Sequence, residues 1–133
     1  MEVTAAAHAA ALWAGLNLIL LLVLSVRVVR LRRRHRVEFG DGERPELALA
    51  VRAFGNATEY VPAAIGAIAV LALVGAPLVL VHAAGLLLFA GRLSHAFGLS
   101  RSGEASRPRA AGVVLTWVAY ILTAVALLFY AIP

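Results

Sequence analysis

The stretch YVPAAIGAIAVLALVGAPLVLVHAAGLLLFAG, residues 60–91, runs for 32 residues without a formal charge. A helix needs about 20 apolar residues to cross the hydrocarbon core of a bilayer, so this stretch is too long for one untilted span. The sequence VGAP at residues 74–77 interrupts it near the middle, and Gly and Pro are typical of helix ends. We therefore expect two transmembrane helices, about residues 45–73 and 77–99, joined by a very short turn.

Two further charge-free stretches of 24 residues, Val3–Val26 and Ala110–Pro133, flank this pair. They predict helices at about residues 3–34 and 109–131. The first stretch is a poor signal peptide, because no basic segment precedes it and basic residues follow it. The predicted fold class is all-α, an integral membrane four-helix bundle in one domain over residues 1–133.

The composition of the 133 residues agrees with a lipid environment. Hydrophobic residues make up 62% and charged residues 14%, against about 45–50% and 25% in soluble domains. A soluble domain of this size cannot bury so much apolar surface, because small chains expose a large share of themselves. The chain has no Cys, which excludes disulfides, thiolate metal sites and a cysteine nucleophile.

The chain has 12 Arg and no Lys, and its formal net charge is +5. These arginines lie between the apolar stretches and do not form a basic face the size of a duplex, so we expect no nucleic-acid partner. Seven lie in or beside the first loop, three in the third loop and none in the second turn. Because cytoplasmic loops are enriched in Lys and Arg, the first and third loops are predicted to be cytoplasmic and both termini to lie on the opposite side.

The second predicted helix contains the most informative polar residues, in VRAFGNATEY at residues 51–60. At 100° per residue, Arg52, Asn56 and Glu59 fall at about 0°, 40° and −20°, so their side chains project from one face. An ionisable group at mid-membrane costs at least about 2.5–3.5 kcal/mol, so this face should meet protein or a wet cavity. Arg binds carboxylates, Asn donates and accepts, and Glu accepts from an ammonium. The pattern favours a zwitterionic or anionic, amino-acid-like ligand.

Structural interpretations compete with this binding site. Arg52 and Glu59 could neutralise one another, or partners on other helices, and only fix the packing of helices, because a buried ion pair does not by itself imply function. In the third predicted helix, GRLSHAFG at residues 91–98 places Arg92 and His95 one turn apart, where both could line the same pocket. His95 alone is more typical of a hydrogen-bonded interior histidine than of a ligand or a base.

Other polar residues give weaker signals. Asn17, inside the first helix, is expected to make an interhelical hydrogen bond. The sequence has no metal-binding spacing such as H-E-x-x-H, no Gly-rich phosphate loop and no G-x-S-x-G. We therefore expect no metal site, no nucleotide site and no serine hydrolase.

These motifs together resemble a known family. Arg52-x-x-x-Asn56-x-x-Glu59-Tyr60, the Pro45-Glu46 pair after an Arg-rich loop, and the segment at residues 91–98 are similar to the membrane-associated proteins of eicosanoid and glutathione metabolism, known as MAPEG. The likeness is greatest to the short bacterial members and covers about residues 24–130. It implies a homotrimer of four-helix subunits that binds glutathione between neighbouring protomers, at the cytoplasmic ends of the helices.

The resemblance also implies roles for individual residues. The residues that would bind glutathione come from three helices: Arg52, Asn56, Glu59 and Tyr60 from the second, Arg92 and His95 from the third, and an arginine among Arg30, Arg32 and Arg33 from the first. The catalytic arginine that stabilises the thiolate would lie at the start of the fourth helix, as Arg109 or, as second choice, Arg107.

The implied function is a glutathione-dependent transferase or peroxidase acting on apolar electrophiles or lipid hydroperoxides that enter from the bilayer. Glutathione brings two carboxylates, one ammonium and one thiol, and a nearby Arg can shift a thiol toward the reactive thiolate. The expected partners are further copies of this chain, membrane lipid and a hydrophobic small molecule. The alternatives are a non-catalytic membrane protein that binds a small anion or lipid head group, a small four-helix transporter, and a purely structural bundle.

Overall fold

Four long helices make up the computed structural model, which describes residues 2–101 and 103–132, with side chains from Ala5 onward. They are α1 (Glu2–His35), α2 (Pro45–Leu73), α3 (Leu78–Arg101) and α4 (Arg107–Tyr130). Each of the four is long and apolar enough to cross a membrane. The predicted all-α, four-helix membrane bundle is therefore confirmed.

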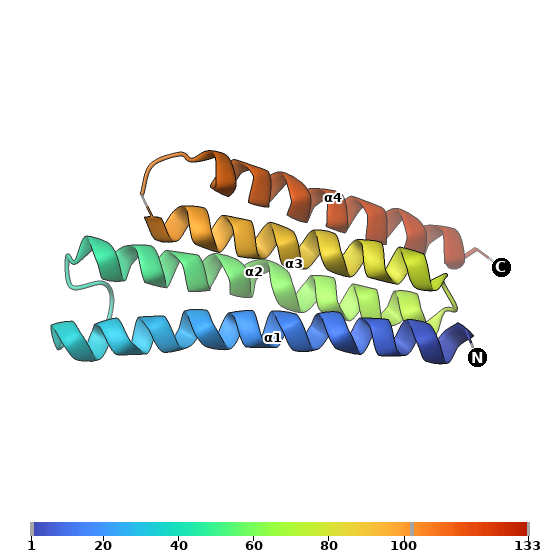
Figure 1. The fold of residues 1–133 in the computed structure, drawn as a ribbon, viewed down its shortest axis with the longest axis horizontal. Coiled ribbons are helices and arrows are strands. Elements are labelled where there is room, and N and C mark those ends of the chain that lie inside the picture. The colour runs from blue at the N-terminus through green and yellow to red at the C-terminus, as the bar shows by residue number, and fades with distance from the viewer. Residues whose placement is uncertain (1, 102, 133) are drawn as a thin grey trace.

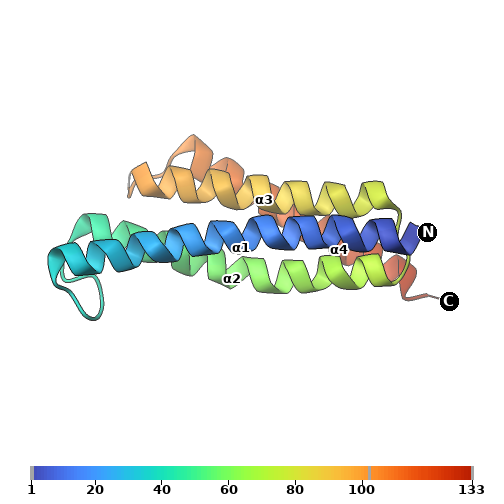
Figure 2. The same cartoon turned by 60° about the horizontal axis from the view of Figure 1, so that its bottom comes forward.

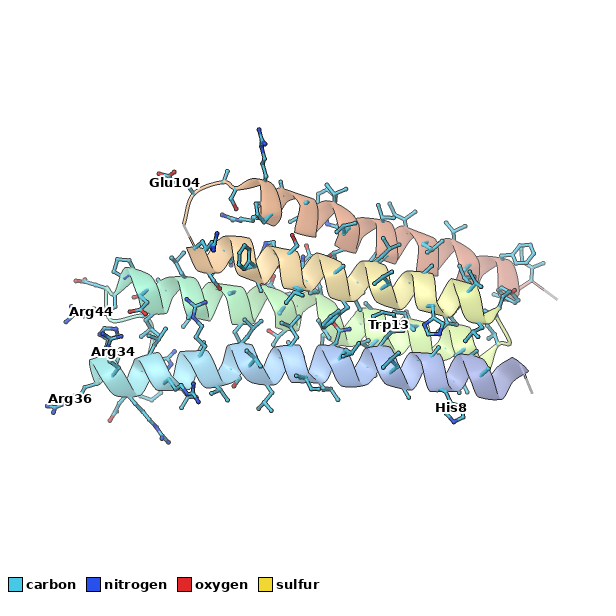
Figure 3. All side chains as sticks on the ribbon, viewed as in Figure 1. His8, Trp13, Arg34, Arg36, Arg44 and Glu104 are labelled. Atoms are coloured by element: carbon cyan, nitrogen blue, oxygen red, sulfur yellow. The ribbon has the colours of Figure 1, made fainter. Side chains whose placement is uncertain are left out.

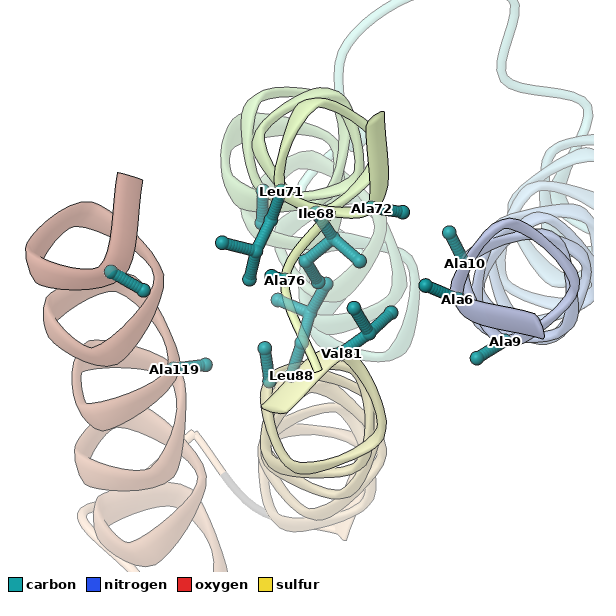
Figure 4. Close-up of a cluster of buried hydrophobic side chains, with 13 residues drawn as sticks. Ala6, Ala9, Ala10, Ile68, Leu71, Ala72, Ala76, Val81, Leu88 and Ala119 are labelled. Carbon is teal, nitrogen blue, oxygen red and sulfur yellow. The ribbon is translucent and has the colours of Figure 1, made fainter. Parts of the chain in front are cut away.

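The helices run alternately up and down along one axis. The α1–α2 and α3–α4 loops lie at one end, and both termini lie with the α2–α3 turn at the other end (Figures 1 and 2). Seen along the helices, α2 and α3 lie between α1 and α4 (Figure 4). Over the described residues, α2 and α3 each pack against all the other helices, whereas α1 and α4 do not touch one another. One face of α2, which carries Arg52 and Glu59, is nevertheless exposed within the chain.

The charged side chains gather at the end of the bundle that holds the two longer loops. Figure 3 shows Arg34, Arg36, Arg44 and Glu104 there, with Trp13 and His8 toward the opposite end. The apolar middle of the bundle lies next to this charged end along the helix axis. This separation is typical of a helix bundle whose loops lie in water and whose middle lies in lipid.

Small side chains allow close packing at the other end of the bundle. Ile68 and Leu71 of α2 and Leu88 of α3 are buried there among alanines of α1 and α4 (Figure 4). Lipid tails are as apolar as Leu, so helices in a membrane associate through van der Waals packing and interhelical hydrogen bonds, and not through water exclusion. Alanine favours this packing because it lets helix backbones approach closely.

The ends of α3 and α4 differ from the predicted ones by one or two residues. Helix α4 begins at Arg107 and not at 109, because Ser106 is extended and its carbonyl accepts the first helical bond, from the Ala110 N–H at 3.0 Å. Pro108 fits this first turn, where its missing N–H has no helical partner to lose. Helix α3 continues to Arg101, two residues beyond the predicted end. Arg109 consequently lies in the first turn of α4.

The expectation for Asn17 is wrong. Its Nδ2 donates to the carbonyl of Trp13 at 2.9 Å, within α1, and its Oδ1 has no partner among the described residues. The hydrogen bond between α1 and α3 comes instead from Trp13, whose Nε1 donates to Nδ1 of His82 at 3.1 Å. A Cβ on Gly85 would collide with the Trp13 ring, so the glycine makes room for the indole.

Candidate functional site

Arg92 of α3 lies at the centre of the polar cluster, with 2% of its surface exposed. Its Nε donates to Oγ1 of Thr116 at 2.8 Å, its Nη1 to Oδ1 of Asn56 at 2.6 Å, and its Nη2 to the carbonyl of Gly112 at 3.4 Å. One guanidinium thus connects three helices. A buried charge needs such partners, because an unpaired one costs several kcal/mol in a low-dielectric interior.

Two glycines bring α3 and α4 close enough for these bonds. A Cβ on Gly112 would lie 2.5 Å from the backbone nitrogen of His95, and a Cβ on Gly91 would lie 2.7 Å from Oγ1 of Thr116. Real Cβ atoms do not approach so closely, so only glycine permits this backbone separation. The close approach places Thr116 and the Gly112 carbonyl within reach of Arg92.

Tyr60 stacks on the guanidinium, and Tyr120 packs against Tyr60. The carbon at the centre of the Arg92 guanidinium lies 4.8 Å from the centroid of the Tyr60 ring, a cation–π distance. The Tyr60 and Tyr120 rings meet edge to face at 5.8 Å, and the Tyr120 hydroxyl donates to the Tyr60 carbonyl at 2.6 Å. Tyr120 therefore fixes the α2–α4 contact beside the cluster.

Asn56 carries the polar network from the interior to the surface of α2. Its Oδ1 accepts from Arg92, which leaves its Nδ2 to donate to Oε2 of Glu59 at 3.4 Å. Arg52 and Glu59 form no ion pair in the part of the chain that the structure describes. The interpretation that these two residues neutralise one another is therefore wrong for a single chain.

Arg52 and Glu59 are exposed on the outer face of α2, which no helix of the same chain covers. Asn56 and Tyr60 are half-buried beside them. The prediction that this face meets protein or a wet cavity is thus not met within one chain. Within one chain, Arg52 and Glu59 are therefore left without protein cover.

His95 and Arg109 extend the cluster toward the loops. His95 is 5% exposed and lies one turn from Arg92, and its charged neighbours are Arg92, Arg109 and Arg52. Arg109 is half-buried and its Nη1 donates to the carbonyl of Gly103 at 3.4 Å, whereas Arg107 is exposed. The structure therefore brings Arg109 toward the cluster and leaves Arg107 at the surface.

Helices α3 and α4 are tied together where Arg109 emerges. The Ser94 hydroxyl donates to the carbonyl of Pro108 at 2.8 Å, and a Cβ on Gly98 would lie 2.6 Å from the backbone nitrogen of Arg109. A hollow of about 420 Å³ opens beside Arg109, with mostly apolar walls. Its lining residues are Ala105, Ser106, Arg109, Ala110, Val113 and Val114.

The three candidates for the one arginine of the first helix that is expected to reach the ligand do not lie together. Arg32 and Arg33 line a hollow of about 500 Å³ under the α1–α2 loop, where Nη1 of Arg32 donates to the carbonyl of Glu38 at 3.1 Å. Arg30 lines a different hollow, beside Glu46. None of the three is hydrogen-bonded to the Arg92 cluster among the described residues.

The cluster is chemically suited to an anion with one basic group. Arg52, Arg92 and Arg109 bring three positive charges against the single carboxylate of Glu59. The Arg92 fork is occupied by protein acceptors, so Arg52 and Arg109 have more donor capacity left for a ligand. No group of three metal-ligating side chains occurs in the described part of the chain.

Sequence reasoning missed the α4 side of the cluster. Gly112, Thr116 and Tyr120 follow one another at intervals of four residues, which places them on one face of α4. This spacing could have been read from the sequence. The contacts that these residues make could not, because they depend on how closely α4 approaches α3.

The chain matches one protein-family model and is similar in sequence to bacterial membrane proteins. The family model described as MAPEG family matches residues 10–129. The Inner membrane protein YecN of Escherichia coli strain K12 is 42% identical over 120 residues, which is 90% of this chain and 90% of that protein. The protein of the same name from E. coli O6:H1 strain CFT073 matches to the same extent. This integral, multi-pass membrane protein therefore belongs to the MAPEG family.

Proposed function

We propose that this protein is a homotrimeric, glutathione-dependent transferase or peroxidase that acts on apolar electrophiles or lipid hydroperoxides. One observation carries the proposal: a chain of hydrogen bonds runs from Arg92 through Asn56 to Glu59. It links a buried guanidinium to the charged, exposed face of α2. Membership of the MAPEG family supports it.

The polar groups complement glutathione one by one. Glutathione has two carboxylates and one ammonium. Arg52 and Arg109 supply guanidinium donors for carboxylates, and Glu59 supplies an acceptor for the ammonium. Asn56 and Arg92 hold Glu59 in place without using its second oxygen. His95 and Tyr60 complete the walls on the α3 and α2 sides.

The exposed face of α2 supports an oligomer, and membership of the MAPEG family favours a homotrimer. Two ionisable residues on a lipid-facing surface cost at least about 5–7 kcal/mol in all on insertion scales. A second copy of the chain removes this cost if it covers the face and encloses the ligand there. Arg32 or Arg33 of that copy, which line a hollow near the end of α1, are the arginines we propose to reach the ligand from the first helix.

Arg109 is the proposed catalytic residue, with Arg107 as the second choice. A guanidinium beside the glutathione sulfur stabilises the thiolate, which is the nucleophile. In conjugation, the thiolate attacks the electrophilic carbon of an aryl halide, the carbon–halogen bond breaks, and halide leaves with the bonding electrons. The apolar hollow beside Arg109 suits an electrophile that arrives from the bilayer.

The proposed reaction lies on the cytoplasmic side. The first and third loops, which flank the cluster, carry the basic side chains, and the α2–α3 turn at the opposite end carries none. Cytoplasmic loops are enriched in Arg, which favours this orientation and places both termini on the other side.

Turnover of an aryl halide tests the proposal. Detergent-solubilised protein is expected to conjugate the halide to glutathione, and Arg109→Ala is expected to lower kcat about 100-fold or more, as for other lost electrostatic stabilisers. Arg107→Ala, with the same charge change at an exposed position, should retain the parent rate. Equal losses in both variants, or no loss in Arg109→Ala, would contradict the assignment.

A non-catalytic binding protein is the second candidate function. It is favoured by the hydrogen bond from Arg109 to the carbonyl of Gly103, which engages part of the guanidinium with the protein's own loop. Saturable glutathione binding without conjugation of aryl halides or reduction of lipid hydroperoxides would select this candidate over the enzyme.

A further inference from the structure

The hollow beside Arg30 and Glu46 lies along α1 at the start of α2, away from the polar cluster. Its volume is about 520 Å³. Two arginines one turn apart, Arg27 and Arg30, lie where the charge-free stretch of the first helix ends, at its loop end. The other lining residues are Leu22, Val23, Val26, Leu31 and Glu46.

The apolar part of this hollow is exposed at the surface of the chain. Leu22, Val23 and Val26 are 62%, 59% and 37% exposed. Leu22 and Val23 precede Arg27 by about one helical turn, and Val26 directly precedes it. At 1.5 Å per residue, Val23 lies about 6 Å deeper along the helix than Arg27. The hollow therefore combines a cationic upper end with an apolar wall that continues toward the membrane centre.

The two guanidinium groups keep their hydrogen-bonding capacity. Neither Arg27 nor Arg30 forms a hydrogen bond or an ion pair with any described side chain or carbonyl. Glu46, the acidic residue at the rim, instead lies 3.5 Å from Nε2 of His35, through its Oε2. The rim is thus positively charged on balance, with donors directed at no protein acceptor.

We propose that this hollow binds an anionic phospholipid, with its phosphate between Arg27 and Arg30 and an acyl chain along Leu22, Val23 and Val26. Arginine is well suited to phosphate, because its planar fork donates two parallel hydrogen bonds. A basic side chain near a membrane surface also attracts anionic lipid. The amphipathic form of the hollow distinguishes this ligand from a free phosphate or a tripeptide.

The lipid site is independent of the proposed glutathione site. Arg30 is one of three candidates for the single first-helix arginine expected to reach glutathione, but it lies in a different hollow from Arg32 and Arg33. The lipid assignment gives Arg30 a separate ligand. It holds whether or not the protein binds a thiol.

Native mass spectrometry of the detergent-solubilised protein tests the proposal, with phosphatidylglycerol as the probe and phosphatidylcholine as the zwitterionic comparison. The parent is expected to retain phosphatidylglycerol in preference to phosphatidylcholine. The double variant Arg27→Gln, Arg30→Gln should weaken phosphatidylglycerol binding about 25-fold, at about fivefold for each basic residue near the surface. Excess glycerol 3-phosphate, which lacks acyl chains, should not displace the lipid.

A matched double variant, Arg34→Gln with Arg36→Gln, removes the same charge from exposed positions at the end of α1. It should bind phosphatidylglycerol with the affinity of the parent. Equal weakening in both double variants would show that the lipid is attracted by overall charge, and would contradict a specific site at Arg27 and Arg30. Val26→Trp, which fills the hollow without changing charge, should also reduce binding, and Val29→Trp should not. Displacement by glycerol 3-phosphate, or unchanged binding in Val26→Trp, would refute the role of the acyl chain.

Discussion

At the scale of single residues, Arg92 determines the geometry of the candidate site. It contributes three hydrogen bonds, to Thr116, Asn56 and Gly112, and it fixes the orientation of the Asn56 amide. That orientation leaves Nδ2 of Asn56 free to donate to Glu59. A residue that is almost fully buried thus decides how an exposed carboxylate is presented.

Arg92→Lys keeps the charge but removes the planar fork, so one ammonium cannot reach all three acceptors. We expect the free energy of unfolding to fall by about 1–2 kcal/mol, because hydrogen bonds inside membrane proteins average about 0.6 kcal/mol each and the freed acceptors stay buried. Thermal denaturation in detergent measures this. Arg101→Lys, at an exposed position of the same helix, should change the midpoint little; an equal change in the two variants would contradict the role of the fork.

At the scale of helices, the close approach of α3 and α4 builds the interior of the cluster. Gly91 and Gly112 face one another across this contact, and each leaves no room for a Cβ. The same contact continues at Gly98, beside the backbone of Arg109. One helix pair therefore positions both the buried guanidinium and the proposed catalytic one.

Gly112→Ala is expected to force α3 and α4 apart, because the new Cβ would lie 2.5 Å from the backbone nitrogen of His95. Overpacking of this kind costs about 1–3 kcal/mol in the free energy of unfolding. Gly15→Ala is the control, since nothing lies within 4 Å of a Cβ there and alanine favours the helix by up to about 1 kcal/mol. A Gly112→Ala variant as stable as the parent would show that the two helices have room to spare.

The four helices could be predicted because the apolar stretches are long and are separated by Gly, Pro and Arg. The exact end residues could not be predicted. Helix α4 begins two residues before the predicted position, because Ser106 is extended, and hydropathy does not specify such a local conformation. Helical spacing predicted that Arg52, Asn56 and Glu59 share a face. It did not reveal what covers that face, nor that Thr116 binds Arg92, because both depend on contacts between segments far apart in the sequence.

At the scale of the whole molecule, the bundle has one charged end and one outer face that its own helices leave open. The charged end holds the two longer loops, and the open face of α2 carries Arg52 and Glu59. Assembly with further copies of the chain would cover the open face, and a fixed orientation in the membrane would place the charged end in the cytoplasm.

The orientation can be tested by labelling, because the natural chain has no Cys. Phe39→Cys lies in the α1–α2 loop at a side chain that is 87% exposed, and Val74→Cys lies in the α2–α3 turn. In intact cells, a membrane-impermeant thiol reagent is expected to label Val74→Cys and not Phe39→Cys. The reverse pattern would invert the proposed topology and move the candidate site to the other side of the membrane.

The most direct test of the whole account is calorimetric titration of the detergent-solubilised protein with reduced glutathione. We predict saturable binding that Arg52→Ala and Glu59→Ala each abolish. Arg44→Ala and Glu43→Ala, which remove charges of the same sign at exposed positions outside the site, should leave binding intact. If the Arg52 and Glu59 variants bind glutathione as the parent does, or if the parent does not bind it, the outer face of α2 is not the glutathione site.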